Sequence, residues 1–372
     1  MISRLSSRGR ILARLFFVAS ASLAWLGDAS LALQPDPATA PAAQTATPRR
    51  DRPPRKVLIG TLISGLDVFK MPLEKRLDLM DSLVGEIAGD ARRDYPGKRL
   101  DLVVLPEAFL ARSGDTVAEQ SVRLEEVRPR IAACAKLHGC YLIAPVLMLE
   151  GHKPRRLSNT AVLVDRGGNL VGVYRKVHPV ALTGSDVLEG GTIPGDDFPV
   201  FDCDFGRLGI QICFDMLYAD GWKALAKAGA EIVALPSASP ETVRPASYAR
   251  ENDFYVVSAS PRDHAAFFSP LGMIEAQVSN QSVLVHEIDL SYARLHWEAI
   301  LENGDALKRR FGDRVGFNYY DKEDMGIFWS NDPRTSIGQM IASVGLIEVG
   351  DSVARIRALQ DKARGGPPLT PP

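Results

Sequence analysis

The residues best suited to chemistry in this chain begin with Cys213. It closes the apolar run Leu208-Gly-Ile-Gln-Ile-Cys213 and is followed at once by Phe214-Asp215. An apolar run that stops on a cysteine before a polar helix start indicates a nucleophile at the carboxyl end of a strand, where open α/β sheets bind ligands. The alternative is a buried cysteine acting as a small hydrophobe, which is the commoner role of this residue.

Two further strand ends carry charged residues. The run Leu102-Val-Val-Leu-Pro106 leads to Glu107, and Leu170-Val-Gly-Val-Tyr174 leads to Arg175-Lys176. Desolvation at a buried strand end would raise the pKa of the Glu107 carboxyl, which suits a general base. Taken singly, Glu107 could equally be a glutamate in the first turn of a helix. Arg175-Lys176 could equally be solvated charges at a strand end. Together, Glu107, Lys176 and Cys213 at three strand exits indicate one catalytic group.

These stretches resemble the nitrilase superfamily, also called carbon–nitrogen hydrolases. The matching segments are Leu105-Pro-Glu107, Tyr174-Arg-Lys176-Val-His178 and Ile212-Cys213-Phe-Asp215, with support from residues 229–237 and 249–257. The similarity covers roughly residues 57 to 290. It implies an α/β fold, a four-layer αββα sandwich, with a Glu107–Lys176–Cys213 triad and assembly as a homodimer. It also implies a further glutamate, for which Glu189 in Glu189-Gly-Gly-Thr is the best candidate.

The residue types suit amide hydrolysis. An amide carbon is a poor electrophile, so the Cys213 sulfur must be deprotonated as it attacks. Glu107 can accept that proton and later activate water, while Lys176 and a backbone N–H such as that of Phe214 stabilise the tetrahedral intermediate. We expect no cofactor and no metal, because the histidines and cysteines show no ligand spacing. His178 is interpreted as a positioning or packing residue.

Composition indicates an ordinary globular protein. The 372 residues are 46% hydrophobic and 24% charged, which allows one large domain with appendages. A net charge of −1 gives no argument for binding nucleic acid or an anionic membrane. The family resemblance implies as partners a small amide, ureido or nitrile substrate and a second copy of the chain.

The N-terminus has the pattern of a secretory signal. Four arginines precede an apolar stretch from Leu15 to Leu26, and Ser30-Leu31-Ala32 forms a small-residue cleavage site. We expect residues 1–32 to be a signal peptide and the protein to be periplasmic or secreted, with an uncleaved anchor as the alternative. The apolar stretch is short for a membrane span. Residues 33–56, rich in proline and alanine with a basic end, predict a disordered linker.

Four cysteines in a chain of this length do not make a disulfide framework. Cys134 and Cys140 flank a predicted helix end and strand start, so they could pair, but free thiols are the expected state. In an oxidising compartment, Cys213 would be exposed to oxidation.

Alternating strands and helices predict layered α/β architecture over residues 57–290. Helices are expected over residues 73–91, 117–138 with an interruption near Pro129, 222–228 and 248–252. Strands are expected at 56–62, 99–105, 141–149, 160–164, 170–175, 200–204, 207–212, 231–235 and 255–259.

Residues 291–372 form a C-terminal extension that the motifs do not explain. It contains the aromatic stretches Val315–Tyr320 and Ile327–Asp332, two short predicted helices and a Gly- and Pro-rich tail. Packing against itself is the default expectation, and a subunit interface or a pocket rim are the alternatives.

The leading functional hypothesis is a hydrolase of non-peptide carbon–nitrogen bonds, of the amide or carbamoyl type. Phe214-Asp215 after the cysteine favours the amidase and N-carbamoyl-hydrolase branches over true nitrilases, in which Trp-Glu is usual. Nitrile hydrolysis is the enzymatic alternative. A catalytically inactive scaffold protein of the same fold is the alternative from another class, against which the intact Glu107, Lys176 and Cys213 argue.

Overall fold

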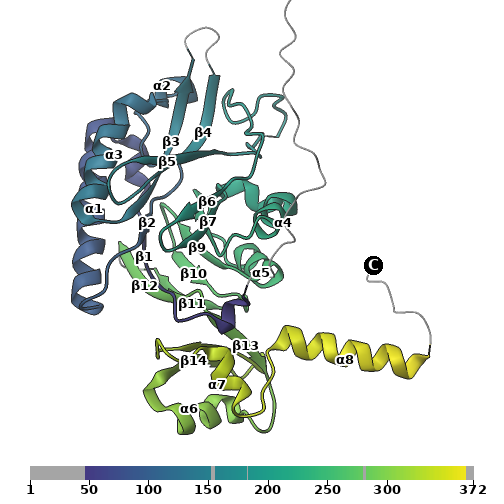
Figure 1. The fold of residues 1–372 in the computed structure, drawn as a ribbon. Coiled ribbons are helices and arrows are strands. Elements are labelled where there is room, and N and C mark those ends of the chain that lie inside the picture. Colours follow the sequence, from purple (N-terminus) through teal and green to yellow (C-terminus); the bar gives the residue numbers. More distant parts are fainter. Residues whose placement is uncertain (1–46, 152–155, 182, 280–281, 366–372) are drawn as a thin grey trace, which may run out of the picture. The chain divides into compact units, whose positions relative to one another are not determined.

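The computed structural model describes residues 47–151, 156–181, 183–279 and 282–365. Within these ranges the chain forms two six-stranded sheets with helices outside them and a three-stranded sheet near the C-terminus (Figure 1). The predicted signal peptide, residues 33–46 of the predicted linker and the tail after residue 365 lie outside the described residues. No described helix is both long and apolar enough to cross a bilayer.

The first sheet has the order β12-β1-β2-β3-β4-β5, in which β1, β2 and β3 run parallel. Its strands are β1 (Lys56–Leu62), β2 (Leu102–Val104), β3 (Tyr141–Glu150), β4 (Arg156–Val164), β5 (Leu170–Arg175) and β12 (Val283–Asp289).

The second sheet has the order β11-β10-β9-β8-β7-β6, with β7, β8 and β9 parallel. Its strands are β6 (Val200–Cys203), β7 (Gly206–Ile210), β8 (Ile232–Pro236), β9 (Tyr255–Ala259), β10 (Ala265–Phe268) and β11 (Ile274–Val278).

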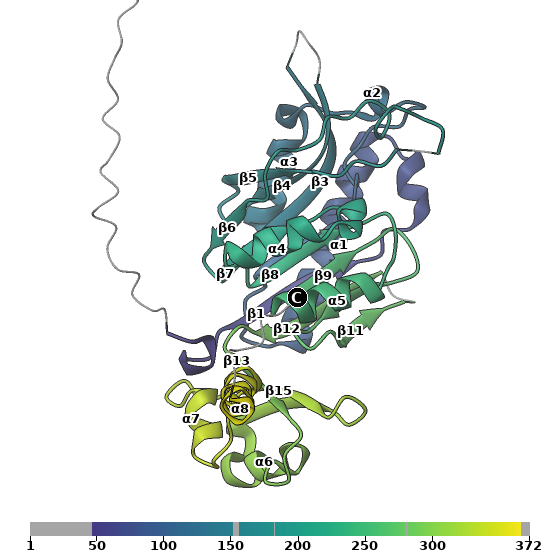
Figure 2. The same ribbon diagram turned by 90° about the vertical axis from the view of Figure 1, so that its right-hand side faces the viewer.

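Helices cover the outer face of each sheet. The first sheet is covered by α1 (Leu73–Asp94) and α3 (Leu124–His138), and the second by α4 (Ala219–Lys227) and α5 (Val243–Asn252). Figure 2 turns α4 and α5 toward the viewer. Short helices in the same region are η3 (Leu66–Lys70), α2 (Val117–Gln120) and η4 (Cys213–Leu217).

Alternation along the central strands shows why four layers form. In β1, Leu58 and Leu62 pack against the helices, whereas Val57 and Ile59 point between the sheets. A parallel strand buried on both faces needs apolar residues at every position, as this sequence provides. The predicted four-layer αββα sandwich is confirmed, since one apolar cluster lies between the sheets and another lies under each pair of helices.

The helix expected over residues 117–138 is two helices, and the break is not at Pro129. Val122 is held in extended form because its N–H donates to Leu147 O and its carbonyl accepts from Leu149 N. Pro129 lies inside α3, where its missing N–H removes one helical hydrogen bond. The buried Val127 and Ile131 hold the helix to the sheet on either side of it.

The last part of the predicted linker is ordered. Residues 47–55, which we call the arm, contain the short helix η2 (Arg49–Asp51) and pack on the folded chain. Arg55 donates to both carboxylate oxygens of Glu231, at 2.6 and 3.0 Å. The Arg49 guanidinium lies 4.0 Å from the ring centre of Tyr292 and 2.5 Å from Asp253. Composition predicted a disordered linker here, but these arginines have carboxylate and aromatic partners supplied by distant segments.

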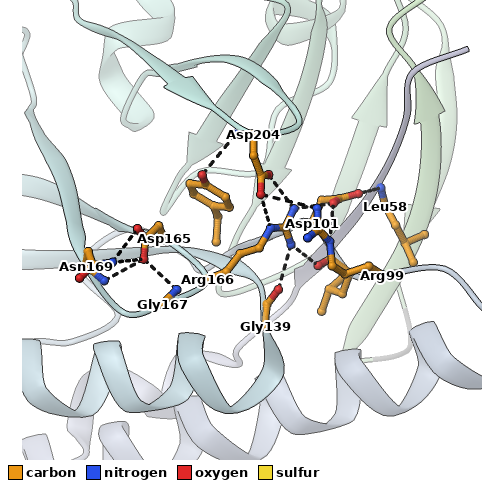
Figure 3. A network of polar contacts seen from close by, with 11 residues as sticks. Leu58, Arg99, Asp101, Gly139, Asp165, Arg166, Gly167, Asn169 and Asp204 are labelled. Carbon is orange, nitrogen blue, oxygen red and sulfur yellow. Dashed lines mark hydrogen bonds and ion pairs between the residues drawn. The ribbon is translucent and has the colours of Figure 1, made fainter. Parts of the chain in front are cut away.

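A second arginine joins the two sheets at the amino ends of their parallel strands (Figure 3). Arg166, in the β4–β5 turn, donates to Asp101 at 2.6 Å and to Asp204 at 2.8 Å. It also donates to the carbonyls of Leu100 and Gly139. Asp101 in turn accepts the N–H of Leu58 at 2.8 Å. This network fixes the sandwich at the end opposite Cys213.

The C-terminal extension packs around its own apolar cluster, as expected by default. Its sheet has the order β13-β15-β14, and two of its strands fall on the aromatic stretches noted in the sequence. The elements are β13 (Tyr292–His296), η5 (Glu302–Gly304), α6 (Asp305–Phe311), η6 (Gly312–Arg314), β14 (Val315–Tyr320), β15 (Met325–Ser330), α7 (Ile337–Ala342) and α8 (Val349–Arg364).

We predict that Glu231 keeps the arm folded. Glu231→Gln retains the shape but removes the charge that Arg55 pairs with, so the free energy of unfolding should fall by about 1 kcal/mol. Trypsin should cut faster at the arginines of residues 49–55. The control Asp202→Asn affects an exposed pair with Arg207 on the same sheet and should change neither measurement. Equal trypsin rates in Glu231→Gln and wild type would contradict the prediction.

Candidate active site

Four predicted site residues come together at the carboxyl ends of the strands. Glu107 follows β2, Lys176 follows β5, and Cys213 begins η4 just beyond β7. Glu189 lies in the long connection between β5 and β6. Glu107 and Lys176 are 5% and 2% exposed, so both charges are taken out of water.

Lys176 is shared by the two carboxylates. Its Nζ donates to Glu107 Oε1 at 2.8 Å and to Glu189 Oε1 at 2.9 Å. Asn159 Nδ2 donates to the same two oxygens, at 2.8 and 3.1 Å. The second oxygen of Glu107 accepts the N–H of Ala238 at 2.9 Å. Glu107 is therefore held on both oxygens.

The nucleophile candidate faces Glu107. The Cys213 thiol and the Glu107 carboxylate are close enough that each affects the pKa of the other, and Ser237 and the Ala238 N–H are close enough to act on the thiol as well. Burial first and the Glu107 charge second raise the pKa of the Cys213 thiol to about 12, against the opposing effect of Lys176. The resting thiol is therefore neutral and needs a base.

The expected raised pKa of Glu107 was wrong. Burial does raise it, but the Lys176 charge and the hydrogen bonds from Lys176, Cys213 and Asn159 outweigh burial, so the pKa of Glu107 is lowered. Burial instead leaves the pKa of Glu189 raised, with Lys176 opposing and the charge of Glu107 adding to the shift. Of the two carboxyls, Glu107 is the one kept ionised.

Backbone strain concentrates at the same place. Cys213, Glu189 and Ala108, which follows Glu107, have φ values of 45°, 38° and 53°. A residue with a side chain in this left-handed region costs on the order of 1–3 kcal/mol and persists only where the surroundings enforce it. Three of the eight such residues in the described parts of the chain thus border one site.

The arm lies away from the four predicted site residues. A groove of about 560 Å³ lined by Arg49, Arg52 and Arg55 also includes Gly206, the first residue of β7. Cys213 stands beyond the other end of that strand, so we assign this groove no part in the chemistry. Within the described ranges, His, Cys, Asp and Glu form no group of three or more that could hold a metal.

A family model described as carbon-nitrogen hydrolase matches residues 63–296. The chain belongs to this family. It is an enzyme family of the nitrilase superfamily, as the motifs around Glu107, Lys176 and Cys213 indicated. Residues 297–372, most of the C-terminal extension, lie beyond the match.

Omega-amidases are among the relatives of this carbon–nitrogen hydrolase. Omega-amidase NIT2-A of Xenopus laevis is 29% identical over 252 residues, which cover 58% of this chain and 89% of that protein. Human omega-amidase NIT2 is 30% identical over 213 residues, covering 51% and 76%.

Solved structures share the fold. Nit3 of Saccharomyces cerevisiae has a TM-score of 0.53 at 21% identity and covers 63% of this chain and 90% of its own. An amidase from Nesterenkonia sp. has a TM-score of 0.51 at 21% identity, covering 64% and 91%.

Sequence reasoning did not find Asn159 or the Ala238 N–H. Asn159 belongs to the polar run Ser158-Asn159-Thr160 inside β4, which was a detectable signal, because polar residues in a buried strand need partners. Ala238 contributes only its backbone, and no side-chain pattern could reveal it. His178, interpreted from the sequence as a positioning or packing residue, has its ring Nδ1 3.0 Å from Asp215 Oδ1.

We predict that Glu107→Gln separates thiol acidity from catalysis. Removing the carboxylate charge should lower the pKa of Cys213, because that charge raises it. Alkylation of Cys213 by iodoacetamide should therefore reach its midpoint at lower pH, while amide turnover falls by about 10²-fold or more because the base is lost.

The matched control is Glu189→Gln. This variant removes a carboxylate that accepts a hydrogen bond from the same Lys176 nitrogen. The Glu189 carboxylate is not among the main causes that raise the pKa of Cys213. Its alkylation midpoint should move less than that of Glu107→Gln. An unchanged midpoint in Glu107→Gln would contradict the assignment of Glu107 as the charge that faces the thiol.

Proposed function

We propose that this carbon–nitrogen hydrolase cleaves small carboxamides through a Cys213 thioester. The observation that carries the proposal is that the Cys213 thiol lies beside a carboxylate, Glu107, to which Lys176 and Asn159 donate hydrogen bonds that lower its pKa. The omega-amidase relatives support an amide as substrate over a nitrile.

In the first half of the reaction, the Cys213 sulfur forms a bond to the amide carbon as its proton passes to Glu107. Lys176 and backbone N–H groups at the start of η4, such as that of Phe214, stabilise the oxyanion. Collapse of the intermediate breaks the carbon–nitrogen bond, and Glu107 returns its proton to the departing ammonia.

In the second half, water attacks the thioester while Glu107 takes one of its protons. Collapse breaks the carbon–sulfur bond and Glu107 returns its proton to the sulfur, which releases the carboxylic acid and restores the thiol. Glu189 anchors Lys176 by accepting a hydrogen bond from its Nζ at 2.9 Å. The two carboxyls thus have separate parts, a base and an anchor.

The test combines a substrate screen with mass spectrometry. Ammonia release should be found with small carboxamides, and Cys213→Ala should abolish it without loss of folding. A slow substrate should leave an acyl adduct on Cys213. The three other cysteines serve as internal controls, because burial also raises the pKa of each thiol. Turnover of nitriles alone, or an adduct on another cysteine, would overturn the proposal.

We also propose export and assembly as a homodimer. The signal pattern of residues 1–32 supports the first, and the family resemblance supports the second. Native protein should begin within residues 33–46 by N-terminal sequencing, and light scattering should give twice the chain mass. A full-length cytoplasmic product would contradict export. A monomer with full activity would contradict the dimer, and a dimer that survives removal of residues 291–372 would exclude the extension from the interface.

A further inference from the structure

One buried carboxylate joins the turn that carries Cys213 to both flanks of Lys176. Asp215 is two residues past Cys213 and is fully buried. Its Oδ2 accepts the N–H of Ile212 and the hydroxyl of Tyr174, both at 2.8 Å. Its Oδ1 accepts the N–H of His178 at 2.9 Å and lies 3.0 Å from His178 Nδ1.

The partners are placed symmetrically about the catalytic lysine. Tyr174 stands two residues before Lys176 and His178 two residues after it, so Asp215 binds a side chain on one side of the lysine and a backbone N–H on the other. Ile212 stands directly before Cys213, so the same carboxylate also holds the residue that leads into the strained φ of 45°. No other described side chain connects these two segments by four hydrogen bonds.

The His178 ring beside Asp215 has two further contacts. The His178 ring stacks on Tyr218 at 4.0 Å, and its Nε2 lies 3.3 Å from Asp220. The hydrogen bond to Asp215 is the main cause that raises the pKa of His178. A buried polar side chain whose hydrogen bonds are satisfied makes the segments that it joins more rigid.

We propose that Asp215 is a positioning residue that sets the separation between the Cys213 sulfur and the Lys176 ammonium. It touches no reacting atom and acts through Tyr174, His178 and Ile212. The kinetic part of this inference rests on the proposed function. The geometric part does not, since Lys176 acts on the thiol whether or not a substrate turns over.

The test is Asp215→Asn, which keeps the size of the side chain. Its amide nitrogen cannot accept hydrogen bonds, so one of the two pairs of donors loses its acceptor. The turn should then move away from Lys176, and kcat should fall about 10-fold or more with KM changed by less than about 3-fold. Because the Lys176 ammonium lowers the pKa of the Cys213 thiol, a larger separation should shift the midpoint of Cys213 alkylation to higher pH.

Two further variants separate positioning from simple stability. Tyr174→Phe removes one of the four hydrogen bonds and should shift the alkylation midpoint in the same direction by a smaller amount, which keeps the test available if Asp215→Asn does not fold. Asp220→Asn removes the charge that lies beside His178 Nε2, on a side chain that is 62% exposed. In this variant kcat should stay within about 2-fold of wild type and the alkylation midpoint within about 0.2 pH units.

A purely structural role gives a different result. Asp215→Asn and Tyr174→Phe would then lower the melting temperature but leave the alkylation midpoint at the wild-type pH, and the proposal would be overturned. If the wild type hydrolyses no amide, the proposed function fails, whereas the alkylation series still decides the position of Cys213 relative to Lys176.

Discussion

The buried ammonium of Lys176 is the constraint on which the rest of the site depends. An ion removed from water loses several kcal/mol of hydration, which only close and well-oriented counter-charges restore. Glu107 and Glu189 supply them, but two carboxylates near one cation repel each other and need further donors. Asn159 and the Ala238 N–H meet that need. The ends of β2, β4, β5 and β8 must therefore converge, and such convergence requires two sheets packed face to face.

The two ends of the sandwich have different tasks. At the amino ends of the parallel strands, Arg166 is satisfied by two carboxylates and two carbonyls and serves only to fix the sheets. At the carboxyl ends, the backbone is strained at Cys213 and Glu189, and Glu189 Oε2 is buried without a hydrogen-bond partner. Strain of this kind persists only where the surrounding structure enforces it.

Much of this arrangement was accessible from the sequence, for identifiable reasons. Glu107, Lys176 and Cys213 each stand at the end of an apolar run, and the end of a strand can be recognised from the sequence alone. Asn159 lies inside a strand, and its position opposite Lys176 depends on the register of β4 with β5, which no local pattern encodes. The lowered pKa of Glu107 was missed because it depends on the balance between burial and three neighbours. The sequence did not predict that the arm is folded, because Arg55 and its partner Glu231 are far apart in the chain.

The protonated resting thiol bears on the proposed export. Oxidation of cysteine proceeds through the thiolate, so a thiol with a pKa of about 12 reacts slowly at neutral pH. Cys140 and Cys203 have pKa values of about 12 as well, and all four cysteines are free. A thiolate nucleophile stabilised by a permanent cation would be oxidised readily outside the cytoplasm. In the proposed mechanism, Glu107 takes the thiol proton only as the sulfur attacks, so the thiolate forms only while substrate occupies the site. Under that proposal, the high thiol pKa that slows oxidation also makes catalysis depend on Glu107.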